Sequence, residues 1–292
     1  MVTHIKEPVK KVLAAFVYEV YRRFAPLKLR VCSIDETLDE LLNTEKSMVR
    51  FGDGEIVVIS GKDIYFQTSS EEISNGLKRI ISYPYEDLMV TLPDIFDGLE
   101  QYVPDSQEFW RDHLLFFRKI YYNYCNCKKK YYNTSVSRCY VTLADKTKSA
   151  GWFEKFRQVF SGKKLVVVEG TGTHNGVGND LFGLAVSVER IICPGRNAYA
   201  VRENILQACL QYEKSDRLFL FSLGITAKSL VEEMFLKGYR VIDIGNLDME
   251  YEWFLRKAVK KEPIPKHSIV GEEANRKAGY EEYLSQIVCY IE

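Results

Sequence analysis

From residue 163 onwards, short apolar runs alternate with segments whose apolar residues recur at helical spacing. The predicted strands are the runs at 165–168, 188–192, 218–223 and 239–244. The predicted helices span 201–212, 226–236 and 247–259. Continuous apolar strands that alternate with helices are typical of a parallel sheet covered on both faces. The pattern therefore predicts an α/β fold, with a mostly parallel central sheet flanked by helices.

The pattern before residue 163 is less regular. Apolar residues at three- and four-residue spacing predict an amphipathic helix over 8–30, and a capping-box sequence from Ser33 to Glu36 predicts a second helix over 35–42. We divide the chain into an N-terminal helical segment, 1–46, and a main domain, 47–292. Within the main domain the other predicted helices are at 69–81, 105–123 and 152–160. A strand is predicted at 88–92, an irregular loop at 125–132 and a short strand after Tyr140. The tail beyond Lys260 is predicted to form a loop over the site and then a helix.

The N-terminal helix is locally basic, since seven Lys and Arg residues between positions 6 and 30 face only Glu7 and Glu19. A basic amphipathic helix can lie on an anionic membrane surface. Packing against the protein's own core is the commoner fate of such an apolar stripe. We favour core packing and keep peripheral membrane contact through residues 6–30 as the alternative.

Composition excludes several classes of protein. The chain is 46% hydrophobic and 27% charged, which is typical of a folded globular protein. Lys plus Arg equals Asp plus Glu at 40 each, so the basic excess of a nucleic-acid binder is absent. The seven Cys are odd in number and the four His are scattered, which argues against a disulfide framework and a structural zinc site. With neither a secretory signal nor a membrane-spanning run of about 20 apolar residues, we expect a cytoplasmic protein.

The stretch 48–55, MVRFGDGE, carries two carboxylates, Asp53 and Glu55, on either side of Gly54. Carboxylates at this spacing can point the same way from a tight turn and bind one divalent cation. Glycine also lets a ligand approach the backbone closely. Because Asp-Gly is the strongest short hairpin signal, this stretch alone favours a solvent-facing hairpin turn over a metal site.

A Gly-rich segment, 169–180, follows the predicted strand 165–168. It does not match the dinucleotide fingerprint, because Asn175 stands where a G-x-G-x-x-G motif beginning at Gly170 requires glycine, and the chain has no Walker G-K-[ST] sequence. The loop could still bind a diphosphate through backbone N–H groups. The alternative is a structural turn in which Asn179 or Asp180 caps a helix.

Ligands of parallel α/β sheets bind at the carboxyl ends of the strands. This rule selects the segments 169–180, 196–197, 224–226 and 243–250. Asp243 ends a predicted strand, whereas Asp248 and Glu250 begin a helix, where the helix dipole favours acids without any catalytic role. No Ser/His/Asp or Cys/His constellation is visible, and His174 is the one His in a predicted loop at this edge.

Taken together, these segments resemble one family, the GT-D-type bacterial glycosyltransferases, formerly a domain of unknown function. The resemblance covers residues 47–258. No single motif is decisive, but the motifs follow one another in the same order. They are RFGDGE at 50–55, Gln67, SRCY at 137–140, VEG at 168–170, GVGNDLF at 176–182, RIICP at 190–194, LGITA at 223–227 and GYRVIDIGNLDMEYEW at 238–253.

The resemblance implies a single Rossmann-like domain and a metal-assisted UDP-sugar site. The implied enzyme moves a hexose, glucose or galactose, from a UDP-sugar to a glycan or glycoprotein acceptor in surface polysaccharide or glycoprotein synthesis. Asp53 and Glu55 would form a D-x-E element that holds Mn²⁺ or Mg²⁺ against the diphosphate, with Glu55 as the expected direct ligand. The catalytic candidates are Asp53, Asp243, Asp248 and Glu250. The residues expected to bind the nucleotide sugar are Arg50, Gln67, Arg138, Glu169, Gly176, Gly178, Asn179, Asp180, Arg190, Thr226 and Asn246.

One departure from the family pattern bears on chemistry. The family has His in a Gly-His-Leu-Asp segment where this chain has Asn246. If that position touches the metal, metal affinity or preference differs here, and if it is a base, the role passes to Asp243 or Asp248. Two competing hypotheses follow: a non-catalytic nucleotide- or sugar-binding module, and a membrane-peripheral transferase at the inner face of the membrane that acts on a lipid-linked acceptor.

Overall fold

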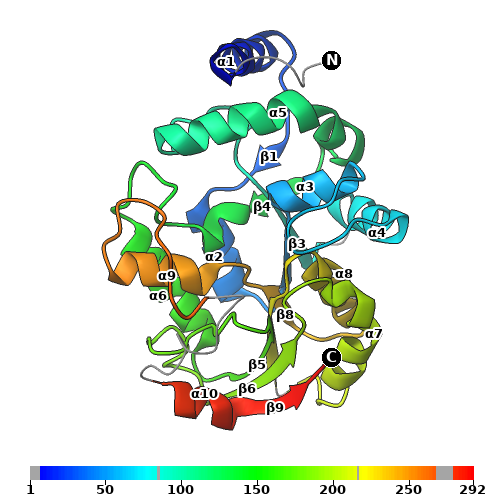
Figure 1. Ribbon diagram of the computed structural model, residues 1–292, viewed down its shortest axis with the longest axis vertical. Helices are drawn as coiled ribbons and strands as arrows, with labels where there is room; N and C mark the ends of the chain where they lie inside the picture. The colour runs from blue at the N-terminus through cyan, green and yellow to red at the C-terminus, as the bar shows by residue number, and fades with distance from the viewer. Residues whose placement is uncertain (1–6, 84–85, 216, 268–278) are drawn as a thin grey trace.

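The computed structural model describes residues 7–83, 86–215, 217–267 and 279–292, which form one α/β domain (Figure 1). Within these residues nine strands form one sheet in the order β1-β4-β3-β2-β8-β7-β5-β6-β9, and all neighbouring strands whose pairing is resolved run parallel. The strands are Arg30–Val31 (β1), Ser47–Arg50 (β2), Leu88–Leu92 (β3), Lys130–Asn133 (β4), Lys164–Gly170 (β5), Ser187–Cys193 (β6), Arg217–Ser222 (β7), Val241–Asp243 (β8) and Ile287–Tyr290 (β9).

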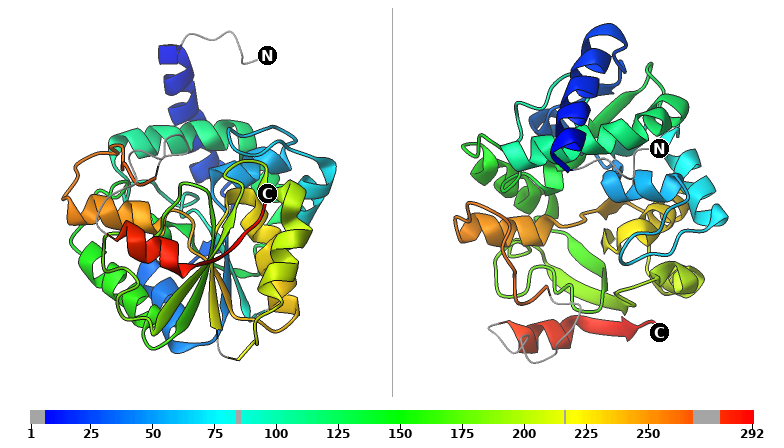
Figure 2. Two further views of the ribbon diagram at one scale, coloured as in Figure 1. Left: turned by 60° about the horizontal axis from the view of Figure 1, so that its bottom comes forward. Right: turned by 45° about the horizontal axis from the view of Figure 1, so that its top comes forward.

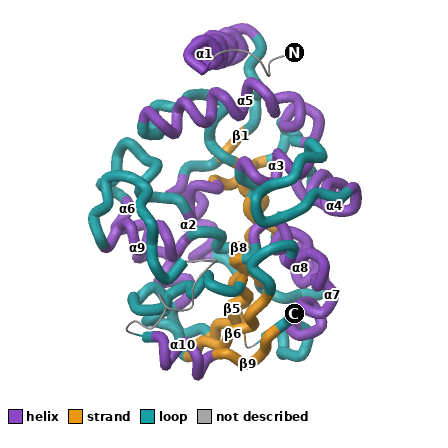
Figure 3. The backbone as a smooth tube through the Cα atoms, in the orientation of Figure 1, coloured by secondary structure: helices purple, strands orange, loops and turns teal. Residues whose placement is uncertain are grey.

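Helices cover both faces of the sheet, so the α/β prediction is confirmed. The strands form a central column between helical layers, with α2, α6 and α9 on one side and α4, α7 and α8 on the other (Figure 2, Figure 3). The helices are Glu7–Phe24 (α1), Ile34–Asn43 (α2), Asp53–Ile59 (α3), Glu71–Ile81 (α4), Pro104–Tyr124 (α5), Ser149–Phe160 (α6), Arg202–Cys209 (α7), Gly224–Leu236 (α8), Leu247–Leu255 (α9) and Tyr280–Gln286 (α10), with short 3-10 helices at Thr134–Ser137 (η1) and Ala198–Val201 (η2).

The stretch 47–59 is a strand followed by a helix, so the hairpin interpretation was wrong. β2 pairs with β3 and β8, and the chain turns at Gly52 directly into α3. The Glu55 carboxylate accepts a hydrogen bond from the backbone N of Gly52 at 2.7 Å. This contact satisfies one of the unpaired N–H groups at the helix start, and it places Asp53 and Glu55 at the carboxyl end of a central strand.

Three other predictions differ from the structure. The segment predicted to be an irregular loop at 125–132 ends in β4, which pairs with β1 and β3. The short strand expected after Tyr140 is absent from the described residues, and η1 precedes that segment instead. The final helix is confirmed as α10, but it runs into β9 at the edge of the sheet. Part of the predicted loop over the site, 268–278, lies outside the described residues.

Residues 30–46 belong to the main fold. β1 pairs with β4 at the sheet edge, and α2 packs against α6 and β4. The capping box at the start of α2 is present as predicted, with Ser33 and Glu36 exchanging hydrogen bonds. These contacts argue against a domain boundary at residue 46.

The apolar core of the sheet fixes the ends of the strands that surround the site. The side chains of Leu165–Val168 in β5 are completely buried, and β5 pairs residue by residue with β6 on one side and β7 on the other. β8 lies between β7 and β2. The carboxyl ends of β2, β8, β7, β5 and β6 therefore lie side by side at one edge of the sheet.

Candidate functional site

A pocket of about 480 Å³ opens at this edge of the sheet. Its volume is in the range of small-molecule and cofactor sites, roughly 300–1,000 Å³. The chain reaches it through segments that directly follow β2, β5, β6, β7 and β8, as expected for a parallel sheet. The residues that line it are Arg50, Gly52–Glu55, Ile64, Phe66, Gln67, Arg138, Gly170–Thr173, Asn175, Pro194, Gly195, Asn197, Ala198, Ser222–Gly224, Thr226, Lys228, Gly245, Asn246, Met249 and His267.

The sequence-based candidates divide into two groups. Those that line the pocket are Arg50, Asp53, Glu55, Gln67, Arg138, Thr226 and Asn246. Those placed behind or beside its walls are Glu169, Gly176, Gly178, Asn179, Asp180, Arg190, Asp243, Asp248 and Glu250. The second group holds the loops that carry the first, as the contacts below show.

A buried lysine lies at the base of the pocket. The Nζ of Lys228, in the second turn of α8, is 2.9 Å from Oε1 of Glu55 and 2.9 Å from Oδ2 of Asp243. It also donates to the backbone carbonyl of Gly224 at 2.9 Å. Asp243 accepts from the backbone N of Arg50 and of Gly245. One ammonium thus connects the ends of β2 and β8 with the start of α8.

The charges of this cluster stabilise one another. Burial disfavours the charged form of Lys228, but the negative charges of Asp243 and Glu55 favour it more strongly. The pKa of Lys228 is therefore raised above 10.5. Burial likewise opposes the Glu55 carboxylate, but the charge and hydrogen bond of Lys228 lower the pKa of Glu55 below 4.5. Both groups are therefore charged at neutral pH, as the low-dielectric environment requires of a buried pair.

Two arginines, Arg50 and Arg138, line the pocket. Arg50 is 8% exposed; it donates from Nη2 to the carbonyl of Thr134, but its buried Nε has no partner. Burial lowers the pKa of Arg50. Gly245 has a φ of +50°, and a Cβ there would collide with Nη1 of Arg50, so only glycine allows this close approach. The guanidinium of Arg138 has no hydrogen-bond or ion-pair partner in the described part of the chain.

Asp53 is the one carboxylate in the pocket wall that has no hydrogen-bond or ion-pair partner within the described ranges. It is exposed at the first position of α3. Both oxygens of Glu55 are engaged, by Gly52 and Lys228. No group of three or more His, Cys, Asp or Glu side chains that could hold a metal occurs among the described residues. Asp53 is therefore the carboxylate of the pocket wall that could contact a divalent cation, whose other ligands would come from the substrate or water, as is common for Mg²⁺; direct ligation by Glu55 would require Lys228 to withdraw.

Glu169 and Arg190 hold the Gly-rich loop in place. They form a buried ion pair of 2.6 Å between Oε1 and Nη1. Glu169 accepts from the backbone N and from Nδ2 of Asn175, and Arg190 donates to the carbonyl of Asn175. Both residues were predicted nucleotide contacts, but their polar atoms are directed at the loop. The loop residues Gly170–Thr173 themselves line the pocket.

The segment 176–180 packs against α9 instead of entering the pocket. Oδ1 of Asp248 accepts from the backbone N of Gly176 at 2.8 Å and from Nδ2 of Asn179 at 2.7 Å. Asp180 accepts from the Tyr251 hydroxyl and pairs with Arg157 on the outer surface. The φ of +74° at Gly178 belongs to the turn between these contacts. The segment 176–180, predicted to contact the nucleotide sugar, therefore lies outside the pocket wall, whereas the preceding residues 170–173 line it.

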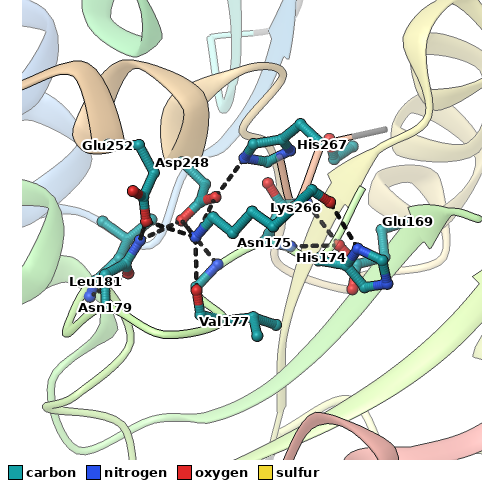
Figure 4. Close-up of polar contacts among 12 residues, drawn as sticks. Glu169, His174, Asn175, Val177, Asn179, Leu181, Asp248, Glu252, Lys266 and His267 are labelled. Atoms are coloured by element: carbon teal, nitrogen blue, oxygen red, sulfur yellow. Dashed lines mark hydrogen bonds and ion pairs between the residues drawn. The ribbon is translucent and has the colours of Figure 1, made fainter. Parts of the chain in front are cut away.

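Asp248 forms a buried polar cluster with the segment after α9 (Figure 4). Its Oδ2 lies 2.6 Å from Nε2 of His267 and 2.9 Å from Nζ of Lys266. Burial would raise the pKa of Asp248, but the hydrogen bond from His267 and the charge of Lys266 hold it far below 3.8. Asp248 is thus a fixed carboxylate that orients His267, and His267 itself lines the pocket.

Glu250 has a similar positioning contact. Its buried Oε2 accepts from the backbone N of Tyr140 and of Val141, at 3.1 and 3.0 Å, and Oε1 has no partner. Burial raises the pKa of Glu250. The contact ties α9 to the loop that carries Arg138, which places Glu250 beside the pocket rather than in its wall.

Sequence reasoning missed three residues that matter to the pocket: Lys228, His267 and Phe66. Lys228 follows Thr226 on a helix, where a lysine ordinarily faces solvent. His267 lies in a tail without periodicity. Asn197, which the strand-end rule did select, has a φ of +49°, accepts from the backbone N of Thr68 and donates its own N–H to the carbonyl of Phe66. The usable signal for Lys228 was also positional, because α8, which carries it, begins shortly after the end of β7.

Comparisons with known proteins agree with this geometry. A sequence model of the family "Glycosyltransferase GT-D fold" matches residues 48–272. The chain is 46% identical over 228 residues to "Probable glycosyl transferase Gly" of Streptococcus gordonii, covering 78% of this chain and 33% of that protein. It is 39% identical over 226 residues to "Glycosyltransferase GlyD" of Streptococcus pneumoniae serotype 4, covering 77% of this chain and 28% of that protein. The chain thus spans about a third or less of the length of these relatives.

Solved structures share the fold over nearly the whole chain. One, described as a new glycosyltransferase from Streptococcus sanguinis, has a TM-score of 0.82 at 41% identity and covers 90% of this chain and 100% of its own. Another, described as a domain of unknown function 1792 with a distinct glycosyltransferase fold, has a TM-score of 0.84 at 34% identity, with 98% and 99% covered.

Proposed function

Because the chain belongs to the family of glycosyltransferases with the GT-D fold, we propose that it transfers a hexose, glucose or galactose, from a UDP-sugar to a hydroxyl of a glycan or glycoprotein acceptor. The observation that carries this proposal is the convergence of Arg50, Arg138 and Lys228 on one pocket beside the unpartnered carboxylate of Asp53. Cations next to a single acid fit a substrate that carries a diphosphate.

The diphosphate lies against Arg50, Arg138 and the loop Gly170–Thr173. The guanidinium groups of both arginines line the pocket, and that of Arg138 has no hydrogen-bond or ion-pair partner among the described residues. In the loop, the N–H groups of Thr171 and Thr173 already donate to the carbonyls of Cys193 and Gly170, which leaves the N–H of Gly172 as the loop's donor within the described part of the chain. Lys228, at the base of the pocket, contributes positive charge while it stays paired with Glu55 and Asp243. These cations stabilise the negative charge that develops on the leaving UDP.

Asp53 would hold a divalent cation, Mn²⁺ or Mg²⁺, in this pocket. When bound, such an ion neutralises charge on the diphosphate as a Lewis acid. Glu55, two positions after Asp53, fixes the start of α3, which carries Asp53. Its carboxylate accepts from the backbone N of Gly52 and pairs with Lys228. Asn246, at the start of α9, lines the same pocket and offers an amide to substrate.

His267 accepts the proton of the acceptor hydroxyl. A carboxylate can only accept a hydrogen bond, so Nε2 of His267 carries the proton that it shares with Asp248, and Nδ1 is left as the basic atom. The acceptor oxygen then forms its bond to the anomeric carbon while the bond from that carbon to the UDP oxygen breaks. The hydroxyl proton passes to Nδ1. Asp243, Asp248 and Glu250 keep their positioning contacts throughout.

The proposal is tested by release of free UDP from a panel of UDP-sugars with Mn²⁺, with Mg²⁺ and with EDTA. We expect turnover with UDP-glucose or UDP-galactose that requires the metal and is lost in Asp53→Asn. The matched control is Asp145→Asn, because Asp145 is fully exposed and bonds only to Thr147. Wild-type turnover in Asp53→Asn, with its fold intact by circular dichroism, contradicts the assignment.

The same assay separates transfer from binding alone. A nucleotide-sugar-binding module without catalysis would bind UDP but release none from any donor, with or without acceptor sugars. UDP binding that is accompanied by metal-dependent UDP release supports the transferase, and binding without release supports the module.

A further inference from the structure

Helix α1 lies on the outside of the protein and contacts it chiefly through α5 (Figure 1). It projects from the body of the molecule in both views of Figure 2. Tertiary packing usually turns the apolar face of such a helix inwards. In α1 a second apolar face points outwards, as the contacts of its two faces show.

The face of α1 that meets the protein is held by polar and apolar contacts. Nζ of Lys10 lies 2.6 Å from Asp112, and Nζ of Lys11 lies 2.6 Å from Glu108, both carboxylates belonging to α5. Ala14 is buried between the helices, and the Tyr18 hydroxyl donates to the carbonyl of Ile95 at 3.4 Å. Leu13 and Val17 are half-buried, and the guanidinium of Arg118 in α5 lies over the ring of Tyr21. Salt bridges and a few apolar and aromatic contacts thus make this attachment.

The face that points away is apolar and exposed. Its side chains recur at three- and four-residue spacing, which puts them on one side of the helix. Their exposed fractions are 58% at Val9, 70% at Val12, 66% at Phe16, 37% at Val20 and 76% at Phe24. We call these five residues the α1 stripe. Nothing in the described chain covers it, so packing on the protein's own core does not account for it.

The charge around the α1 stripe is positive. Residues 7–30 contain six basic and two acidic residues. Glu19 is paired with Arg22, whereas Arg23 and Lys28 are exposed and have no ion-pair partner in the described residues. Arg23 follows Val20 by three residues and precedes Phe24, so it lies at the edge of the stripe. An apolar stripe bordered by unpaired basic residues matches the surface of an anionic bilayer.

We propose that the α1 stripe binds an anionic lipid surface, with α1 lying in the interface plane and the domain held beside the membrane. No helix in the described residues is long and apolar enough to cross a bilayer, and the proposed contact is with its surface. A second copy of this chain is a poorer occupant, because an α1–α1 contact would bring two basic segments together. The lysines that attach α1 to α5 stay in their salt bridges in this arrangement.

The test is co-sedimentation of the whole protein with vesicles of phosphatidylcholine alone and of phosphatidylcholine with phosphatidylglycerol. We expect binding to the anionic vesicles that weakens with salt. Val12→Asp should lower the partition coefficient by about tenfold or more, because an apolar contact becomes a repelled charge. Arg23→Gln should lower it by about fivefold. Val186→Asp is the matched control, since Val186 is 64% exposed and lies before β6, away from α1.

Each outcome decides the proposal. Loss of binding in Val12→Asp with full binding in Val186→Asp supports it, provided that both variants keep the wild-type circular dichroism spectrum and melting temperature. Absence of wild-type binding to anionic vesicles overturns it, as does equal binding of the two Asp variants. A wild-type dimer in analytical ultracentrifugation that Val12→Asp converts to a monomer assigns the stripe to a second copy and also overturns it.

Discussion

The Nζ of Lys228 lies 2.9 Å from Oε1 of Glu55, at the base of the pocket. The same atom is 2.9 Å from Asp243. The second acid of the Asp53-Gly54-Glu55 sequence therefore has an internal cation as its partner. The two acids, which look equivalent in sequence, differ in their surroundings: Glu55 fixes the turn, and Asp53 is exposed in the pocket wall without a partner among the described residues.

Replacement of Lys228 by Met is expected to lower the free energy of unfolding by about 3–5 kcal/mol, because two buried carboxylates lose their shared cation. Urea denaturation at pH 7 measures the change. Lys237→Met, at an exposed position after α8, is the control and should change the value by no more than about 0.5 kcal/mol. Equal stability of Lys228→Met and wild type would show that the cluster does not stabilise the fold.

The carboxyl group of Asp94 makes the free energy of unfolding depend on pH in a predictable direction. Burial, with a smaller contribution from the charge of Asp97, raises the pKa of Asp94 to about 6 from an ordinary 3.8. The folded state therefore binds the proton more tightly than the unfolded chain, so this group's contribution to stability is full below about pH 4 and is lost as the pH rises through about 6.

Asp94→Asn removes that loss and should stabilise the protein at pH 8 by about 1–3 kcal/mol relative to wild type. The difference should shrink towards zero at pH 4. Denaturant unfolding of both proteins at several pH values measures it. Asp97→Asn, which relieves only the smaller charge contribution, should give a smaller gain. A difference between Asp94→Asn and wild type that does not vary with pH would contradict the assignment.

The contribution of Asp248 to stability depends on pH in the direction opposite to that of Asp94. Its pKa is held far below 3.8 in the folded state by His267 and Lys266 against the effect of burial. Its contribution to stability is therefore present above about pH 4 and is lost as the pH falls further. Asp248→Asn should be less stable than wild type by about 3 kcal/mol at pH 7, and the two unfolding curves should converge in acid. Curves that stay equally far apart between pH 7 and pH 3 would refute this.

His267→Gln separates chemistry from binding. If His267 takes the proton of the acceptor, kcat should fall by about 100- to 10,000-fold, while the dissociation constant for UDP stays within about twofold. Steady-state kinetics and calorimetric titration of UDP provide the two numbers. A parallel loss of UDP affinity would assign His267 to the nucleotide, and an unchanged kcat would remove it from the reaction.

The sequence predicts an element well where the local pattern of apolar and polar residues determines its structure. It predicts an element poorly where contacts with residues distant in sequence determine it. β5 and β7 are continuous apolar runs, so their strand state and their burial on both faces follow from the pattern alone. β4, KYYN, has only four residues and follows a polar, basic segment, and it is a strand because β1 and β3 pair with it. Asp-Gly at 53–54 has the local preference of a hairpin, but β2 is a central strand and the chain leaves it as a helix.

The same distinction holds for the site. Arg50, Asp53 and Arg138 could be chosen because they belong to motifs that resemble those of the family, and they line the pocket. Lys228 could not be chosen from helical periodicity, because only Glu55 and Asp243, distant in sequence, make its burial favourable. For α1, the amphipathic pattern predicted an apolar face but not its direction, which the salt bridges from Lys10 and Lys11 decide.

The central claim is that this pocket holds the diphosphate of a UDP-sugar, and calorimetric titration of UDP in the presence of Mn²⁺ tests it most directly, because no acceptor is needed. The account predicts that wild type binds UDP, that Arg138→Gln binds it about 10- to 100-fold more weakly through the loss of charge-assisted hydrogen bonds, and that Arg23→Gln on α1 binds it as wild type does. Absence of UDP binding to wild type, or equal affinity of wild type and Arg138→Gln, would contradict it.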